Sequence, residues 1–195
     1  MTKNRLEAFS DGVFAVIITI MVLELKVPHD VTLAAARQLA PAFFTYVLSY
    51  VFLGIYWNNH HHMLHVTERI NGEVLWANLH LLFWLSLTPF VTGWMGENHF
   101  AAVPTAVYGA VMVCAGISYT ILQGAIIRCQ GPRSKLAALV KRDIKGKLSI
   151  TMYAAAVPMA FVNQMVSVAL YVAVAIIWFV PDRRIEANVN RHESV

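Results

Sequence analysis

Long apolar stretches alternate with short polar ones along most of the chain. Four of these stretches, residues 9–27, 39–58, 74–95 and 101–127, are mostly apolar. An α-helix crosses the roughly 30 Å hydrocarbon core of a bilayer with about 20 such residues. The pattern therefore predicts four membrane-spanning helices.

A fifth apolar region, residues 148–180, is too long for one span. As a single helix its 33 residues would extend about 50 Å, against a core of roughly 30 Å. The pair Asn163-Gln164 lies near its middle and suits a tight polar turn. We therefore expect two helices here, over residues 148–162 and 165–180, which makes six spans in all.

The positions of the basic residues agree with six spans and a cytoplasmic N-terminus. With this topology, 13 of the 15 lysines and arginines lie on the cytoplasmic side, and only Lys26 and Arg37 lie outside. Five spans would instead place Arg183 and Arg184 outside. The expected fold class is all-α: a polytopic membrane protein with both termini in the cytoplasm, a six-helix transmembrane domain over residues 1–181 and a polar tail over residues 182–195.

Composition and charge fit this class. The chain is 58% hydrophobic and 13% charged, about half the charged fraction of an ordinary soluble domain. The net charge of +4 comes from basic residues in loops, above all residues 128–147, which favours contact with membrane lipids over nucleic acid. The first apolar stretch is too long for a cleavable signal peptide, so this helix is expected in the mature protein.

The first helix carries two kinds of surface. An apolar stripe on one side has a single hydroxyl and no charge, and consists of Gly12, Val16, Thr19, Ile20 and Leu23. Asp11 lies roughly 140° around the helix from Val16, and it is not at i,i+4 spacing from Arg5. We therefore expect the partners of Arg5 and Asp11 on other helices, and Glu24 as a solvated residue at the outer end.

The six-span topology brings further polar residues to the depth of Asp11. The end of the second span and the start of the third meet the start of the first at the cytoplasmic side. In low dielectric such side chains must bond one another. The predicted polar layer consists of Arg5, Ser10, Asp11, Trp57, one or more of His60, His61 and His62, Asn78 and His80.

Three interpretations fit the histidines of this layer. They are hydrogen-bonded structural residues, or a metal site that uses His61 and His65 at i,i+4 spacing, or proton-responsive groups. The absence of nearby cysteines and of an HExxH pattern favours the structural interpretation. GxSxG, P-loop and paired intramembrane carboxylate patterns are also missing from the sequence, so we expect no enzyme activity and no bound cofactor or metal.

Three segments resemble one family of membrane proteins. Arg5-x-x-x-Phe9-Ser10-Asp11 opens the first span, FLGIYWNNHHHM (residues 52–63) ends the second, and NLHLLFWLSLTPF (residues 78–90) lies in the third. Together they resemble the transmembrane protein 175 family of potassium channels. The length matches one prokaryotic six-span repeat of that family, so the resemblance covers essentially the whole chain.

The resemblance implies a homotetramer in a prokaryotic plasma (inner) membrane, with the first helix of each subunit lining a central pore for potassium. A constriction of bulky apolar side chains takes the place of a carbonyl filter in that family. By distance from Asp11 the constriction falls on Val16, with Thr19 and Leu23 on successive turns outward. Valine stands where isoleucine or leucine is usual, and Ile20 on the same face shares the constriction in this interpretation.

Two other functions compete with a channel. A small proton- or cation-coupled secondary transporter would use Asp11 and His80 as titrating groups. A non-transporting membrane scaffold would use the apolar stripe as a packing seam. The sequence shows no inverted repeat, which counts against the transporter.

Overall fold

The computed structural model describes residues 2–140 and 143–179 of the chain. Every regular element in these two ranges is a helix, as expected. The elements are α1 Lys3–Leu23, α2 Leu33–Gln38, α3 Ala40–His65, α4 Gly72–Ser86, α5 Thr88–Glu97, α6 Ala102–Gln130, α7 Lys135–Val140, α8 Ile144–Met159 and α9 Gln164–Phe179. The predicted polar tail, residues 182–195, lies outside the described residues.

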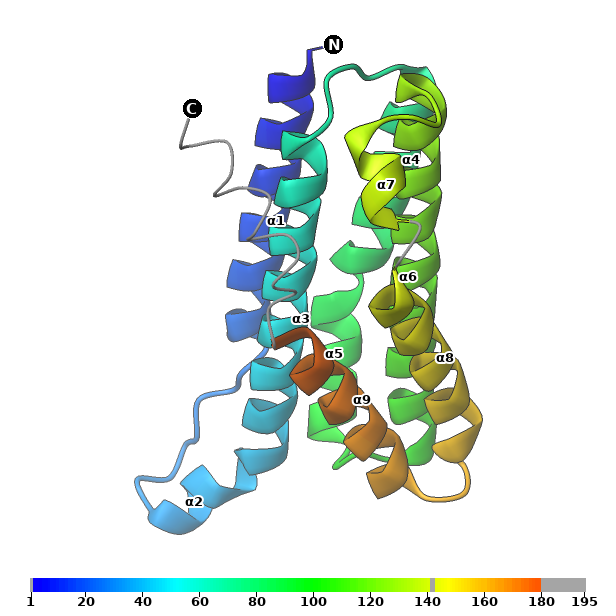
Figure 1. Cartoon of the computed structure of the whole chain (residues 1–195). Helices are drawn as coiled ribbons and strands as arrows, with labels where there is room; N and C mark the ends of the chain where they lie inside the picture. The colour runs from blue at the N-terminus through cyan, green and yellow to red at the C-terminus, as the bar shows by residue number, and fades with distance from the viewer. Residues whose placement is uncertain (1, 141–142, 180–195) are drawn as a thin grey trace.

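The long helices run up and down the molecule beside one another (Figure 1). α6 packs against α4, α5, α8 and α9, so it joins the two halves of the bundle. α3 packs against α1, α5 and α9, and α1 also contacts α4 and α5. α1 therefore lies on the flank of the bundle, where other helices cover only part of its surface.

Four helical stretches are long and apolar enough to cross a membrane: α1, α3, α4 together with α5, and α6. This agrees with the first four predicted spans and makes the chain an integral membrane protein. α8 and α9 are separated at Asn163, whose side-chain oxygen accepts a hydrogen bond from the Met165 amide at 3.0 Å. Each has 16 residues and is about 24 Å long, so the count of six full spans remains a prediction.

Two helix boundaries differ from the sequence prediction. The third span is not one helix over residues 74–95, because it breaks at Leu87 between α4 and α5. Pro89 has no N–H for the Leu85 carbonyl and its ring crowds that carbonyl, which interrupts the helix. The second span continues to His65 instead of residue 58, so its histidines all lie on α3.

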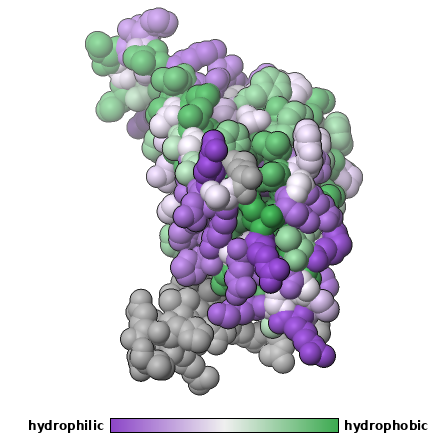
Figure 2. Space-filling view, turned by 90° about the horizontal axis from the view of Figure 1, so that it is seen from above, coloured by the Kyte–Doolittle hydropathy of each residue, from purple (hydrophilic) through white to green (hydrophobic). Residues whose placement is uncertain are grey.

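One end of the bundle is hydrophilic. The N-terminus and the α3–α4 and α6–α7 connections meet there, and hydrophilic side chains gather over this face in Figure 2. Arg69 and Arg133 belong to these connections. At the opposite end, α2 projects from the bundle after the turn that follows α1 (Figure 1).

Packing in the second half of the bundle depends on close approach at two glycines of α6. A Cβ on Gly109 would overlap the Tyr171 hydroxyl of α9, and one on Gly116 would lie 2.8 Å from Ile150 Cγ1 of α8. Small residues let helices approach closely within a bilayer, and these two glycines do so here. Tyr171 gains a hydrogen bond of 2.9 Å to the Thr105 carbonyl in the same place.

We expect Gly109→Ala to destabilise the protein, because its Cβ would displace Tyr171 from the Thr105 carbonyl. The free energy of unfolding should fall by about 1–3 kcal/mol, which is typical when a side chain is forced into a packed core. Gly54→Ala is the matched control, since a Cβ on Gly54 meets no atom within 4 Å. Thermal unfolding in detergent, followed by tryptophan fluorescence, would show a lower midpoint for Gly109→Ala only. Equal midpoints for the two variants would contradict this account.

Candidate functional site

Three polar contacts join the first half of α1 to the end of α3. Lys3 Nζ donates to the His65 carbonyl at 3.0 Å, the Glu7 carboxylate contacts His61 Nδ1 at 3.2 Å, and Trp57 Nε1 donates to Asp11 Oδ1 at 2.9 Å. Each contact lies four residues further along α1 and four residues back along α3. The two helices are antiparallel neighbours, so this spacing places one contact on every turn. We call these three contacts the α1–α3 ladder.

A second set of hydrogen bonds joins α1, α3 and α4 in the interior. Asn78 Nδ2 donates to Ser10 Oγ at 3.0 Å, and Ser10 Oγ donates to the Leu6 carbonyl at 2.9 Å. Asn78 Oδ1 lies 2.7 Å from His60 Nε2. All three side chains are at most 1% exposed, so they bond one another where water does not reach.

The direction of these bonds fixes the tautomer of His60. Asn78 uses its amide nitrogen on Ser10, so its oxygen accepts from His60 Nε2–H. His60 Nδ1 is buried and has no hydrogen-bond partner among the described residues. The ring of Phe14 lies 5.7 Å away between centroids and covers one side of the imidazole. A neutral ring suits this apolar contact, and it fits the structural interpretation of this histidine.

Arg5 and His80 do not join the polar layer of one subunit. Arg5 is exposed and makes no hydrogen bond or ion pair with the described residues. His80 is also exposed, and its Nε2 accepts from Trp84 Nε1 on the same helix at 3.0 Å. Asp11 bonds Trp57 and His80 bonds Trp84, so within the described residues the two titrating groups of the transporter interpretation do not bond one another.

The opposite face of α1 is exposed in the described part of the chain. Val16 is 54% exposed, Ile20 41% and Leu23 79%, and Gly12 and Thr19 are exposed as well. The Thr19 hydroxyl donates to the carbonyls of Ala15 and Val16 at 3.0 and 2.9 Å, so its donor is satisfied inside the helix. The oxygen lone pairs of Thr19 remain available on the exposed side.

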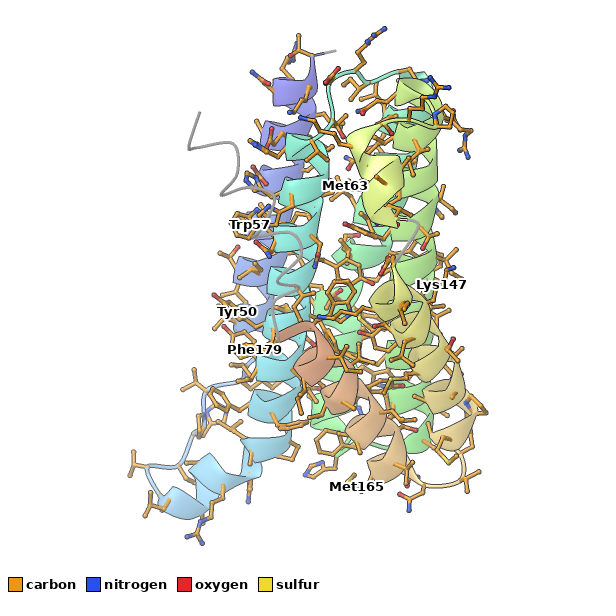
Figure 3. All side chains as sticks on the ribbon, viewed as in Figure 1. Tyr50, Trp57, Met63, Lys147, Met165 and Phe179 are labelled. Carbon is orange, nitrogen blue, oxygen red and sulfur yellow. The ribbon has the colours of Figure 1, made fainter. Side chains whose placement is uncertain are left out.

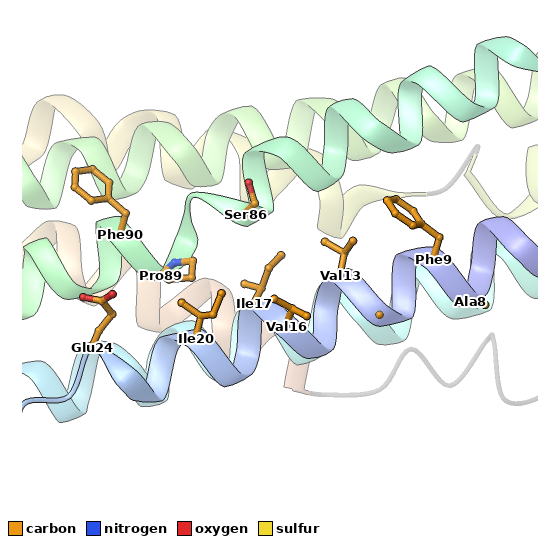
Figure 4. A pocket seen from close by; sticks show the side chains of 11 residues that line it. Ala8, Phe9, Val13, Val16, Ile17, Ile20, Glu24, Ser86, Pro89 and Phe90 are labelled. Atoms are coloured by element: carbon orange, nitrogen blue, oxygen red, sulfur yellow. The ribbon is translucent and has the colours of Figure 1, made fainter.

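A groove of 690 Å³ follows this face of α1. Phe9, Val16 and Ile20 lie along one wall, and the interruption between α4 and α5 forms the other with Ser86, Pro89 and Phe90 (Figure 4). The helix break at Leu87 thus lies directly beside the stripe. The predicted pore residues Val16 and Ile20 both line this groove, whereas Thr19 and Leu23 lie beside it on the same exposed face.

The sequence interpretation missed several residues of this site. Lys3 and Glu7 belong to the ladder, and Pro89 and Phe90 to the groove. The ladder had a signal in the sequence, because Glu7 and Asp11 repeat at i,i+4 and so do Trp57 and His61. Within the described ranges, no group of three histidine, cysteine or acidic side chains is placed to hold a metal ion.

Figure 3 shows how the two sides of the bundle differ at mid-height. Trp57 lies on the side formed by α1 and α3, whereas Lys147 lies on the far side with α8. The polar contacts of the site join α1, α3 and α4. The remaining helices form the support on which this flank is built.

Removal of the Asn78 amide should destabilise the three-helix contact. Asn78→Leu leaves the His60 N–H without an acceptor and Ser10 without a donor, at an expected cost of about 1–3 kcal/mol. Asn58→Leu is the matched control, because Asn58 is exposed on α3. Thermal unfolding in detergent should distinguish the two variants. A parental midpoint for Asn78→Leu would show that this network contributes nothing to stability.

Comparison with known proteins agrees with the geometry of α1 and α3. The family described as "Endosomal/lysosomal potassium channel TMEM175" matches residues 5–89, which include the Glu7–His61 and Asp11–Trp57 contacts of the ladder and the α4–α5 break. A potassium channel of Chryseobacterium sp. (strain P1-3) is 48% identical over 192 residues, 98% of this chain and 100% of that protein. A potassium channel of Streptomyces collinus is 30% identical over 181 residues, 87% of each chain.

A solved structure shares the fold. It is the crystal structure of a lysosomal potassium-selective channel TMEM175 homolog from Chamaesiphon minutus, with a TM-score of 0.78 and 27% identity. The match covers 90% of this chain and 95% of that one. With near-complete coverage at 48% identity to one relative, and with the signature residues at the start of α1, the chain belongs to the TMEM175 family as a prokaryotic member.

Proposed function

We propose that the chain is the subunit of a homotetrameric potassium channel in which four copies of α1 surround a central pore. The two relatives described above are named potassium channels, and the family is a channel family, which is not a class of enzymes. In this proposal Val16 and Ile20 form the apolar constriction, and Thr19 and Leu23 lie on the turns toward the outer mouth. The channel holds no cofactor, and its permeant ions are monovalent cations.

One observation carries this proposal: α1 has an ordered polar face and an uncovered apolar face. The ladder and the Ser10–Asn78–His60 network hold one side of α1 against its own subunit. The stripe on the other side remains exposed in the described part of the subunit. A helix that only faced lipid would not need so many polar contacts to fix its rotation, whereas a pore-lining helix does.

In this proposal the constriction gates by excluding water. A ring of valine and isoleucine side chains offers no ligand, so an ion crosses it nearly hydrated, and the ring closes the pore when it loses water. The hydroxyl oxygens of four Thr19 side chains would lie next to this ring. They can replace part of the hydration shell of an ion, which is where discrimination between potassium and sodium would arise.

The topology of the proposed channel follows the charge distribution. The hydrophilic end with the N-terminus faces the cytoplasm, both termini lie there, and the channel resides in a prokaryotic plasma membrane. Arg5 has no partner within the described part of one subunit, so its anchoring role would be a contact with a neighbouring copy. Crosslinking of the purified protein to a four-subunit species would support the assembly.

The first test is ion flux through the purified protein in liposomes under a potassium gradient. We expect a potassium flux at channel rates, a smaller sodium flux and no requirement for a proton gradient. A slow, saturable flux that depends on a proton gradient would instead support the secondary transporter. Protein-free liposomes and liposomes with heat-inactivated protein are the controls.

The second test addresses the α1 stripe by reversal potentials and single-channel currents in planar bilayers. Val16→Ala should raise the conductance because it widens the constriction. Thr19→Val, which removes the hydroxyl and keeps the shape, should lower the K⁺/Na⁺ permeability ratio several-fold. Thr19→Ser is the matched control and should keep the ratio of the parent. If Val16→Ala and Thr19→Val both keep the parental conductance and selectivity, this face of α1 does not line the pore.

A further inference from the structure

The proposed constriction does not distinguish cations from anions. Its side chains are valine, isoleucine and a threonine hydroxyl, all uncharged. An apolar ring opposes the dehydration of either sign of ion. The end of the bundle with the N-terminus is rich in lysine and arginine, which attract anions. A potassium channel built on this helix therefore needs a negative group elsewhere along the path.

Glu24 is the charged side chain among the described residues that line the groove of α1. It lies one helical turn beyond Ile20, at the outer end of the stripe, and Figure 4 shows it beside Phe90 of α5. The other acidic residues of α1 face away from the groove. Asp11 accepts from Trp57 and Glu7 contacts His61, both in the ladder.

The carboxylate of Glu24 fits closely against α5. A Cβ on Gly93 would lie 3.2 Å from Glu24 Oε2, so a glycine at this position leaves room for the carboxylate. Glu24 makes no ion pair with the described residues. Its neighbour Lys26 instead pairs with Glu97 at 2.7 Å, and this hydrogen bond raises the pKa of Lys26, with a smaller contribution from the charge of Glu24.

The position of Glu24 is unfavourable for the helix itself. It is the C-cap residue of α1, and the last turn holds no basic side chain. A negative charge there meets the negative end of the helix dipole, a repulsion of about 0.3–1 kcal/mol. Stability of α1 therefore gives no reason for a carboxylate at this position, whereas selection of cations does.

We propose that Glu24 sets the charge selectivity of the channel. This inference rests on the proposed function, in which four copies place four Glu24 carboxylates around the outer mouth. Their field concentrates cations and repels anions before either reaches the apolar ring. Two parts of the pore thus have different roles. Glu24 selects cations over anions, and the stripe around Val16 and Thr19 selects among cations.

The test is the K⁺/Cl⁻ permeability ratio of the purified channel in planar bilayers under a KCl gradient. Glu24→Gln should lower this ratio at least threefold and should lower the single-channel conductance at about 0.1 M KCl. The K⁺/Na⁺ ratio should stay that of the parent. Near 1 M KCl the conductances of variant and parent should converge, because the Debye length falls from about 10 Å to about 3 Å.

Two variants and one variant-free measurement complete the design. Glu24→Asp keeps the charge and should keep the parental K⁺/Cl⁻ ratio. Asp30→Asn removes an exposed carboxylate outside the groove and should also leave it unchanged. In the parent itself, the K⁺/Cl⁻ ratio should fall between about 0.1 and 1 M salt.

The outcomes separate this inference from the proposed function. A conducting Glu24→Gln channel with the parental K⁺/Cl⁻ ratio and low-salt conductance overturns the role of Glu24 alone. If the K⁺/Cl⁻ ratio of the parent channel does not change with salt concentration, the role of Glu24 is likewise overturned, without the use of any variant. A parent that carries no potassium current overturns the proposed function, and this inference with it.

Discussion

The α1–α3 ladder fixes the rotation of α1, and the architecture of the site depends on it. Within a bilayer, apolar side chains are equally well accommodated by lipid and by other helices, so hydrophobicity alone does not orient a helix. Hydrogen bonds and ion pairs do, because an unbonded polar group in this environment is costly. One contact per turn, from Lys3 through Glu7 to Asp11, leaves α1 with a single favourable rotation.

The Ser10–Asn78–His60 network fixes the position of α1 along its axis and joins a third helix, α4, to α1 and α3. Ser10 joins α1 to α4 by a hydrogen bond to Asn78, and His60 of α3 bonds the same Asn78 side chain. Because these groups satisfy one another away from water, a shift of α1 along its axis would break the Ser10–Asn78 hydrogen bond and leave buried polar groups unbonded. The rotation of α1 is thus set by the ladder and its depth by the network.

The sequence predicted the first four spans because their length and composition are local properties. It also predicted that Ser10, Asp11, Trp57, His60 and Asn78 share one layer, since alternating helices bring their ends to the same depth. It did not predict which of the candidates take part. Whether His80 faces the layer or the exposed side of the bundle depends on the rotation of α4, a tertiary property. The break at Leu87 was missed although Pro89 marks it, because the apolar pattern continues across it.

The antiparallel pairing could have revealed the ladder. Two helices that run in opposite directions bring together residues whose numbers have a constant sum, and the pairs Lys3–His65, Glu7–His61 and Asp11–Trp57 share one. The signature Phe9-Ser10-Asp11 has a related explanation. Successive helical residues point about 100° apart: Phe9 faces the groove, Ser10 faces Asn78 of α4, and Asp11 faces Trp57 of α3. Three adjacent residues therefore contact two neighbouring helices and leave the third direction open, which is the geometry that a pore-lining helix requires.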